Sequence, residues 1–210
     1  RTFDLKAILI ACGTVSTTAL EVLAQENPIP VLGVVAPAAA AAARATRNDR
    51  VGLIGTQASI RSGAYEALIH KEDPAAQVFS QPCPLFVPLV ENGRFKPGDV
   101  VIETVAAEYL APLKAAGVDT LVLGCTHYPL LEGVISAQMG PEVTLVNAGA
   151  EGARAAAARL AELDALSGRD GGGTCRYFVS DRQEDFSRLA SIFLGWDVTG
   201  AVGQVDISRY

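Results

Sequence analysis

One pattern occurs twice in this chain, and it constrains the fold more than any other feature of the sequence. The segments Ile8–Cys12 and Leu121–Cys125 each consist of an apolar run, a small residue and a cysteine. The two cysteines lie 113 residues apart (125 − 12 = 113), and the same offset aligns the run at 31–34 with the run at 144–147. A repeated unit of strand, helix, strand and helix predicts two related lobes. Strand–helix units resemble one another in general, so a chance match stays open as the alternative.

Short runs rich in β-branched residues alternate with alanine-rich helical stretches along the whole chain. This alternation predicts an α/β fold in which mostly parallel sheets are flanked by helices. Strands are expected at residues 7–11, 31–35, 51–54, 77–80, 120–123, 143–146 and 177–179. Helices are expected at residues 16–25, 38–47, 62–70, 100–116, 130–138, 149–166 and 183–194. The glycine-rich stretch 168–173 predicts a flexible loop.

Composition and charge exclude several classes of protein. With 210 residues, of which 50% are hydrophobic and 19% charged, the chain can bury an ordinary globular core. The net charge of −6 and the absence of a Lys/Arg cluster argue against nucleic acid as a partner. The longest apolar stretch, 29–43, contains two prolines and is shorter than the ~20 residues that cross a bilayer, so no membrane partner is expected.

The cysteines and histidines indicate free thiols without a metal. The four cysteines stand far apart at positions 12, 83, 125 and 175, and the chain has only two histidines. These spacings provide neither a paired redox motif nor a set of metal ligands. No lysine follows a predicted strand, so a Schiff-base cofactor is not expected. We therefore expect a cytoplasmic protein that uses no cofactor.

Two of the cysteines occupy positions suited to chemistry. Cys12 and Cys125 each fall just past the carboxyl end of a predicted strand, where parallel sheets form their ligand crevice and the next helix directs its positive end. A free thiol has a pKa of about 8.5, and this placement favours a lower value. Cys83 and Cys175 have no such placement, so we interpret them as ordinary buried apolar residues.

A pair of equivalent thiols on opposing lobes favours a particular class of reaction. Two acid–base groups facing one cleft can remove a proton from one face of a carbon and return it to the other face, which is racemisation or epimerisation. His127 lies two residues after Cys125 and can exchange protons with that thiol. The alternative for His127 is a histidine at a helix start that only binds backbone groups.

Hydroxyl side chains follow the predicted strand ends as well. They are Thr14, Thr56, Ser59 and Thr126. Hydroxyl groups at this rim can hold a carboxylate, although each one taken alone is also a common helix cap. The four together favour binding of a small anion.

Several segments resemble bacterial glutamate racemases, and the similarity extends over nearly the whole chain. The segments are Ala11–Ser16, Val51–Thr56 with Ser59, Ser62–Glu66, Cys83–Glu91 and the distinctive Gly124–Leu131. The resemblance implies a cofactor-independent isomerase of the aspartate/glutamate racemase superfamily that supplies D-glutamate for peptidoglycan. It also implies two pseudo-symmetric lobes with the active site in the cleft between them.

The resemblance assigns roles to individual residues. Cys12 and Cys125 match the catalytic cysteines, His127 and Glu91 match groups that assist the second cysteine, and the four hydroxyl residues match positions that contact the substrate. It further implies that residues 1–36 and 147–210 form the first lobe and residues 37–146 the second.

The sequence departs from the family pattern at two places. Gly13 stands where the family commonly has asparagine, so a backbone N–H or a water must replace that side-chain amide. The family's opening strand with an Asp-Ser-Gly turn, and its Pro-Tyr-Gly loop, have no counterpart here. We interpret the chain as a fragment, and we expect it to exchange the Cα proton of glutamate slowly and unequally for the two enantiomers.

Two other functions stay open on the sequence. One is a non-catalytic module that binds an amino acid or a partner protein, and the other is an aspartate or hydantoin racemase. A cysteine hydrolase is disfavoured, because no Asp or Asn that could orient a base accompanies a single thiol. The sequence also leaves the oligomeric state open, with a homodimer as one option.

Overall fold

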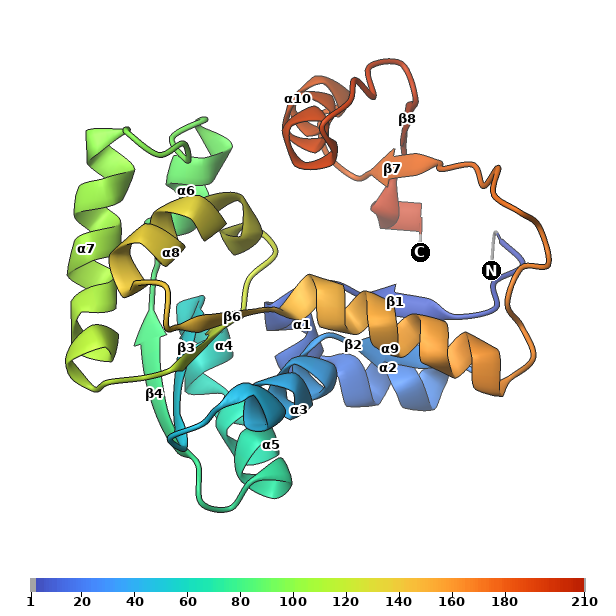
Figure 1. Cartoon of the computed structure of the whole chain (residues 1–210). Helices are drawn as coiled ribbons and strands as arrows, with labels where there is room; N and C mark the ends of the chain where they lie inside the picture. Colours follow the sequence, from blue (N-terminus) through green and yellow to red (C-terminus); the bar gives the residue numbers. More distant parts are fainter. Residues whose placement is uncertain (1–2, 210) are drawn as a thin grey trace. The chain divides into compact units, whose positions relative to one another are not determined.

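The computed structural model describes residues 3–209 and divides the chain into two compact units. The first unit ends at Leu166 and the second begins at Ser167 (Figure 1). These units differ from the lobes that the family resemblance implies, and the lobe boundaries stay a prediction. Among the described helices, none is both long and apolar enough to cross a membrane.

The centre of the first unit is a parallel sheet of four strands. The strands are β3 (Arg50–Gly55), β4 (Gln77–Pro82), β5 (Thr120–Leu123) and β6 (Thr144–Asn147), and their order is β4-β3-β5-β6. All three pairings are parallel, as the alternating pattern predicts. The two central strands, β3 and β5, are almost wholly buried because helices cover both faces of the sheet.

One face of this sheet packs against α6 (Phe86–Glu91), α7 (Val100–Ala115) and α8 (Glu132–Met139). Leu121 and Leu123 of β5 point into this core. Successive strand residues face opposite sides of a sheet. The residue between these two leucines therefore belongs to the opposite core.

The other face packs against α3 (Val35–Ala45) and α5 (Ala64–Glu72). Val122 of β5 points into this second core, which also holds the fully buried alanines of α3: Ala38, Ala39 and Ala42. Their small side chains let α3 lie close to the sheet and to α5. The alanine-rich sequence of this helix is thus explained by tight packing between layers.

A second, two-stranded parallel sheet lies in the same unit. It pairs β1 (Ile8–Ile10) with β2 (Val31–Gly33), and α1 (Gly13–Thr18) and α2 (Leu20–Glu26) connect the two strands. Helix α9 (Ala148–Glu162) contacts both strands and also α3 (Figure 1). The helices α3 and α9 therefore join this sheet to the four-stranded sheet.

The predicted repeat has a direct counterpart in the structure. Strands β1 and β2 correspond to β5 and β6, and each pair is parallel. The helices that follow each pair, α3 and α9, begin at Val35 and Ala148, and these two residues are separated by the repeat offset. The pairing register differs by one residue, since Ile8 pairs with Val31 whereas Leu121 pairs with Leu145.

Several short elements were not expected from the sequence. They are α4 (Gln57–Arg61), α6 and the 3-10 helix η1 (Tyr128–Leu131). The stretch predicted as one helix at 16–25 is interrupted at Ala19, whose φ of −129° and ψ of −5° are not helical. Short helices of one or two turns contain too few residues to show a clear apolar period.

The second unit contains a parallel pair, β7 (Tyr177–Val179) and β8 (Val202–Gln204), with α10 (Gln183–Leu194) and the 3-10 helix η2 (Ile207–Arg209). Strand β8 was not predicted.

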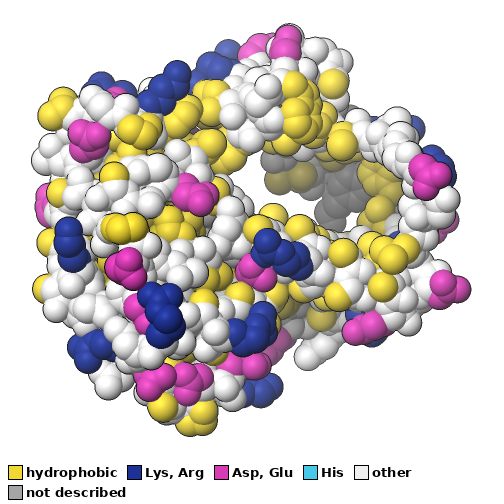
Figure 2. Space-filling model, viewed as in Figure 1, with side chains coloured by type: hydrophobic (Ala, Val, Ile, Leu, Met, Phe, Trp, Pro, Cys, Tyr) yellow, Lys and Arg dark blue, Asp and Glu magenta, His cyan; other side chains and the backbone are white. Residues whose placement is uncertain are grey.

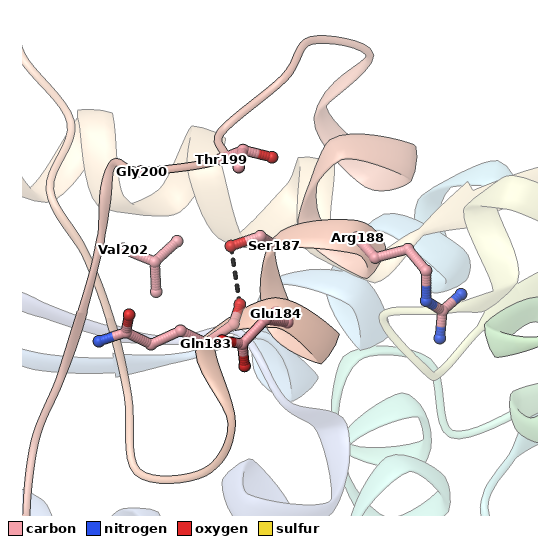
Figure 3. A pocket seen from close by; sticks show the side chains of 7 residues that line it. All are labelled: Gln183, Glu184, Ser187, Arg188, Thr199, Gly200 and Val202. Atoms are coloured by element: carbon pink, nitrogen blue, oxygen red, sulfur yellow. Dashed lines mark hydrogen bonds between the residues drawn. The ribbon is translucent and has the colours of Figure 1, made fainter.

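A hollow of about 500 Å³ lies in the second unit, between α10 and the segment around Thr199 (Figure 3). At this hollow the hydroxyl of Ser187 donates a hydrogen bond of 2.7 Å to the Gln183 carbonyl.

Lys and Arg side chains are scattered among Asp and Glu on the face of the molecule shown in Figure 2, and they do not gather into one patch there. Apolar side chains are interspersed between them. This face therefore lacks the continuous basic stripe by which nucleic-acid-binding proteins neutralise phosphates.

Candidate active site

The order of the strands locates a crevice at the end of the four-stranded sheet. From the adjacent strands β3 and β5 the chain continues in opposite directions, to β4 on one side and to β6 on the other. Ligands of open parallel sheets bind at such a switch point, outside the carboxyl ends of the strands. Thr56 directly follows β3, and Gly124, Cys125 and Thr126 directly follow β5.

The turn that carries Cys12 meets the turn that carries Cys125. Cys12 is the N-cap of α1, and a Cβ atom on Gly13 would overlap the carbonyl oxygen of Gly124. A Cβ atom on Gly124 would in turn lie 2.8 Å from the Ile54 carbonyl oxygen. The two turns therefore touch through glycine backbones, and this contact explains why position 13 has no side chain in this sequence.

Three of the four predicted hydroxyl residues form one cluster. The Thr14 hydroxyl lies 2.9 Å from that of Thr56 and 3.3 Å from that of Ser59, and the Thr56 and Ser59 hydroxyls lie 3.1 Å apart. Thr56 also caps α4, because its oxygen accepts a hydrogen bond from the Ser59 N–H. Capping therefore accounts for part of the role of Thr56. Its contact with Thr14 has a different effect, because it joins the start of α4 to the start of α1.

Cys125 is the first member of a chain of polar side chains. Its Sγ lies 3.8 Å from His127 Nδ1, and His127 Nε2 lies 3.0 Å from Glu91 Oε1 at the end of α6. The fourth hydroxyl residue, Thr126, lies 3.4 Å from the same Nδ1 atom. A carboxylate accepts the Nε2 proton, so the neutral ring directs the lone pair of Nδ1 toward the thiol. The side chain of His127 makes no capping hydrogen bond with η1, the alternative that the sequence left open.

The expected lowering of the thiol pKa is not found at Cys125. Burial raises the pKa of this thiol, and this effect outweighs hydrogen bonds from the backbone and from Thr126, which favour the thiolate. The 3-10 helix η1 lies between Cys125 and the helix expected at 130–138, which begins at Glu132 as α8, so little helix dipole acts on the sulfur. The thiolate of Cys125 therefore needs a proton acceptor, and Nδ1 of His127 is in position to be one.

The other two cysteines lie outside this arrangement. Cys83 is fully buried in the core formed with α7 and α8, as predicted, and burial raises its pKa far above the ordinary range. Cys175 belongs to the second unit and is exposed, so its interpretation as a buried apolar residue is wrong. It lies in an irregular segment before β7, where there is too little packing to cover it.

One residue at the contact between the turns was not singled out by the sequence. Tyr65, in the first turn of α5, is buried, and its hydroxyl lies 3.7 Å from the position that a Cβ atom on Gly13 would take. Tyr65 belongs to the segment Ser62–Glu66 that contributed to the family resemblance, but no spacing rule assigns a buried tyrosine to a site. Within residues 3–209, no three His, Cys, Asp or Glu side chains are grouped so that they could hold a metal ion.

Comparison with known proteins identifies the family. The sequence profile described as Asp/Glu/Hydantoin racemase matches residues 3–156. The chain belongs to the Asp/Glu/Hydantoin racemase family. The resemblance stated from its motifs is confirmed, and so is the expected enzyme class, an isomerase.

Individual members of the racemase family are similar over most of this chain. A glutamate racemase from Geobacter metallireducens is 46% identical over 204 residues, which are 97% of this chain and 74% of that protein. The crystal structure of a glutamate racemase from Bacillus anthracis superposes with a TM-score of 0.90 at 34% identity and covers 98% of this chain and 75% of that one. A glutamate racemase from Francisella tularensis in complex with D-glutamate gives a TM-score of 0.87 at 30% identity, with the same coverage. These structures confirm the predicted α/β fold of this racemase-family chain.

Proposed function

We propose that this chain interconverts L- and D-glutamate with Cys12 and Cys125 as the two acid–base groups. The observation that carries the proposal is the contact between Gly13 and Gly124, because it brings the two cysteine-bearing turns of the repeat against each other. The names of the similar proteins support glutamate as the substrate. A site with two equivalent thiols at one crevice suits a reaction in which a proton leaves one face of a carbon and arrives on the other.

The proposed reaction has two proton transfers at Cα. The thiolate of one cysteine takes the Cα proton, and the electron pair of that C–H bond remains on the substrate, where it delocalises into the carboxylate. The thiol of the other cysteine then gives its proton to the opposite face of Cα. At the end the first cysteine is a thiol and the second is a thiolate, so the reverse reaction starts from the other enantiomer.

His127 and Glu91 have a defined part in this scheme. Burial disfavours the thiolate of Cys125, so a neighbouring base must accept the thiol proton. His127 Nδ1 accepts that proton, and the Glu91 carboxylate then faces a positively charged ring across the 3.0 Å hydrogen bond. In the described part of the chain, no histidine or carboxylate makes a hydrogen bond with the Cys12 thiol. Cys125 therefore has a neighbouring base that can accept its thiol proton, whereas Cys12 does not have a hydrogen-bonded one among the described residues.

The hydroxyl cluster is the proposed binding site for the substrate carboxylate. Thr14, Thr56 and Ser59 already exchange hydrogen bonds among themselves, and hydroxyl groups can rotate to donate to an anion. Thr126 and the backbone N–H of Gly13 are the further donors that we propose on the cysteine turns. Neutral donors of this kind hold a carboxylate without placing a permanent cation beside the thiolates.

The test is deuterium exchange at Cα. The purified chain is incubated in D₂O with L-glutamate, D-glutamate or either enantiomer of aspartate, and the label in each amino acid is measured by mass spectrometry. Exchange of glutamate above that of a Cys12→Ala/Cys125→Ala double variant supports the proposal. Faster exchange of aspartate would point to an aspartate racemase, and calorimetric binding of glutamate without any exchange would point to a binding module; either result would overturn the proposal.

The place of this activity in the cell is also a proposal. We propose that the chain acts on free glutamate in the cytoplasm and supplies D-glutamate for peptidoglycan, as the family resemblance implies. The lobes would consist of residues 1–36 with 147–210, and of residues 37–146. A bacterial strain that lacks its own glutamate racemase and needs D-glutamate in the medium gives the cellular test: expression of this chain should remove that need.

A further inference from the structure

The hydroxyl of Tyr65 is an anomaly in an otherwise satisfied core. Tyr65 is 1% exposed, and among the buried side-chain nitrogen and oxygen atoms of the described residues its oxygen alone has no hydrogen-bond partner. A buried donor without a partner lowers stability, and a phenylalanine would fill the same space without this cost. The position of the hydroxyl therefore needs an explanation other than packing.

A second buried tyrosine shows the ordinary arrangement. Tyr128 is also fully buried, and its hydroxyl donates a hydrogen bond of 3.1 Å to the carbonyl oxygen of Cys83. Its ring packs edge-to-face against Phe86 with centroids 5.3 Å apart. The fold thus can satisfy a buried phenol, and the unpartnered state is specific to Tyr65.

Tyr65 lies at the contact between the two cysteine-bearing turns. Its oxygen is 3.7 Å from the Cβ position of Gly13, and its ring atom Cε2 is 3.5 Å from the Cβ position of Gly124. Gly13 is adjacent in sequence to Cys12, and Gly124 is adjacent to Cys125. The Tyr65 side chain therefore lies beside both turns that carry the proposed acid–base groups, and its unused hydroxyl donor lies on the side of Gly13.

We propose that Tyr65 is a positioning residue whose hydroxyl supplies a hydrogen bond, directly or through one water, that stabilises negative charge on the cysteine thiols. The proposal rests on the proposed function, since it takes the two cysteines as the reacting groups. It deepens that function by adding a donor that serves both thiols from one position.

The electrostatics of the site agree with a donor. Burial raises the pKa of Tyr65 far above its usual value, and negative charge at Cys125 and Cys12 raises it further, so the phenol stays protonated and keeps its proton to donate. The titratable groups that face Cys125 are His127, Cys83, Tyr128, Cys12 and Tyr65. Among these groups, only the Tyr65 hydroxyl both keeps its proton and makes no other hydrogen bond.

The experiment compares Tyr65→Phe with Tyr128→Phe, which removes a hydroxyl that already has a partner. The rate of alkylation by iodoacetamide is followed for each cysteine by peptide mass spectrometry between pH 6 and pH 10. We expect Tyr65→Phe to raise the pH of half-maximal alkylation at Cys125 and to slow alkylation of Cys125 and Cys12 at pH 7 by several-fold. Exposed Cys175 is the internal control and should keep its rate.

The two variants should differ in stability as well as in reactivity. Tyr65→Phe should leave the melting temperature unchanged or raise it, because an unsatisfied donor is removed, whereas Tyr128→Phe should lower it and leave the alkylation profile of Cys125 in place. An unchanged profile of Cys125 in a folded Tyr65→Phe variant would overturn the proposal.

A second substitution tests the same donor without removing it. Replacement of Tyr65 by 3-fluorotyrosine makes the hydroxyl a stronger donor, so the pH of half-maximal alkylation at Cys125 should fall instead of rise. A shift in the same direction as that of Tyr65→Phe would contradict the proposal. Alkylation needs no turnover, so a failure of the racemase proposal would appear in the deuterium assay alone and would be distinguishable from a failure here.

Discussion

Glu91 Oε1 lies 3.0 Å from Nε2 of His127, and this contact favours the ring tautomer in which Nδ1, 3.8 Å from the Cys125 sulfur, carries no proton. A carboxylate accepts a proton at that distance and cannot donate one when it is ionised. The other nitrogen, Nδ1, is consequently the acceptor for the thiol proton. The side chain at the end of α6 thus acts on the chemistry of a residue that follows β5.

The variant Glu91→Gln should slow Cα proton exchange for only one of the two glutamate enantiomers. A glutamine amide can donate as well as accept, so it no longer holds the Nε2–H tautomer, and it provides no charge to stabilise the imidazolium. We expect exchange of the enantiomer deprotonated by Cys125 to fall by roughly 10-fold, the effect of one charge-assisted hydrogen bond. Deuterium wash-in from each enantiomer measures this, with the exposed Glu72→Gln as the matched control. Equal losses for both enantiomers would contradict the assignment.

Removal of either proposed acid–base thiol should abolish most of the exchange. Cys12→Ala and Cys125→Ala should each lower turnover by about 10²–10⁴-fold, the range expected for a general acid–base group. Cys175→Ala removes an exposed thiol of the other compact unit and should leave turnover unchanged. Near-normal turnover in both directions for either of the first two variants would exclude the two-base mechanism.

The glycine contact predicts an effect of any side chain at position 13. In Gly13→Ala the new methyl group would overlap the carbonyl oxygen of Gly124, so the two turns must separate. We expect a loss of roughly 1–3 kcal/mol in the free energy of unfolding, the usual cost of overpacking, together with slower exchange. Urea denaturation gives the first quantity. Gly168→Ala, which meets nothing within 4 Å, is the control and should change neither.

Stability should decline on the alkaline side because of the buried thiols. Burial raises the pKa of Cys83 and of Cys125 in the folded state, whereas in the unfolded chain a thiol ionises near its usual value of about 8.5. Above that pH the unfolded state releases protons that the folded state retains, so the free energy of unfolding falls as pH rises. Urea midpoints at pH 7, 8 and 9 measure the slope. The slope should become shallower in Cys83→Val and remain unchanged in Cys175→Ala; a midpoint that rises with pH would show the sign to be wrong.

The sequence by itself determined the longer helices and all of the described strands except β8. All seven predicted strands form. The central strands β3 and β5 are buried, and a buried parallel strand needs a continuous apolar run that is visible without any knowledge of its partners. The repeat was visible for the same reason, and it placed Cys12 and Cys125 past the carboxyl ends of β1 and β5. The family motifs added His127, Glu91 and the hydroxyl residues as candidates.

Only the tertiary structure decided how these candidates meet. The order β4-β3-β5-β6 brings Thr56 beside the turn after β5, and no local pattern encodes the order of strands in a sheet. Burial at Cys125 depends on residues from several distant elements, so the sequence suggested a lowered thiol pKa where the fold raises it. Tyr65 was recognised only from its position, because an unpartnered hydroxyl is a property of everything that surrounds the side chain and not of the helix that carries it.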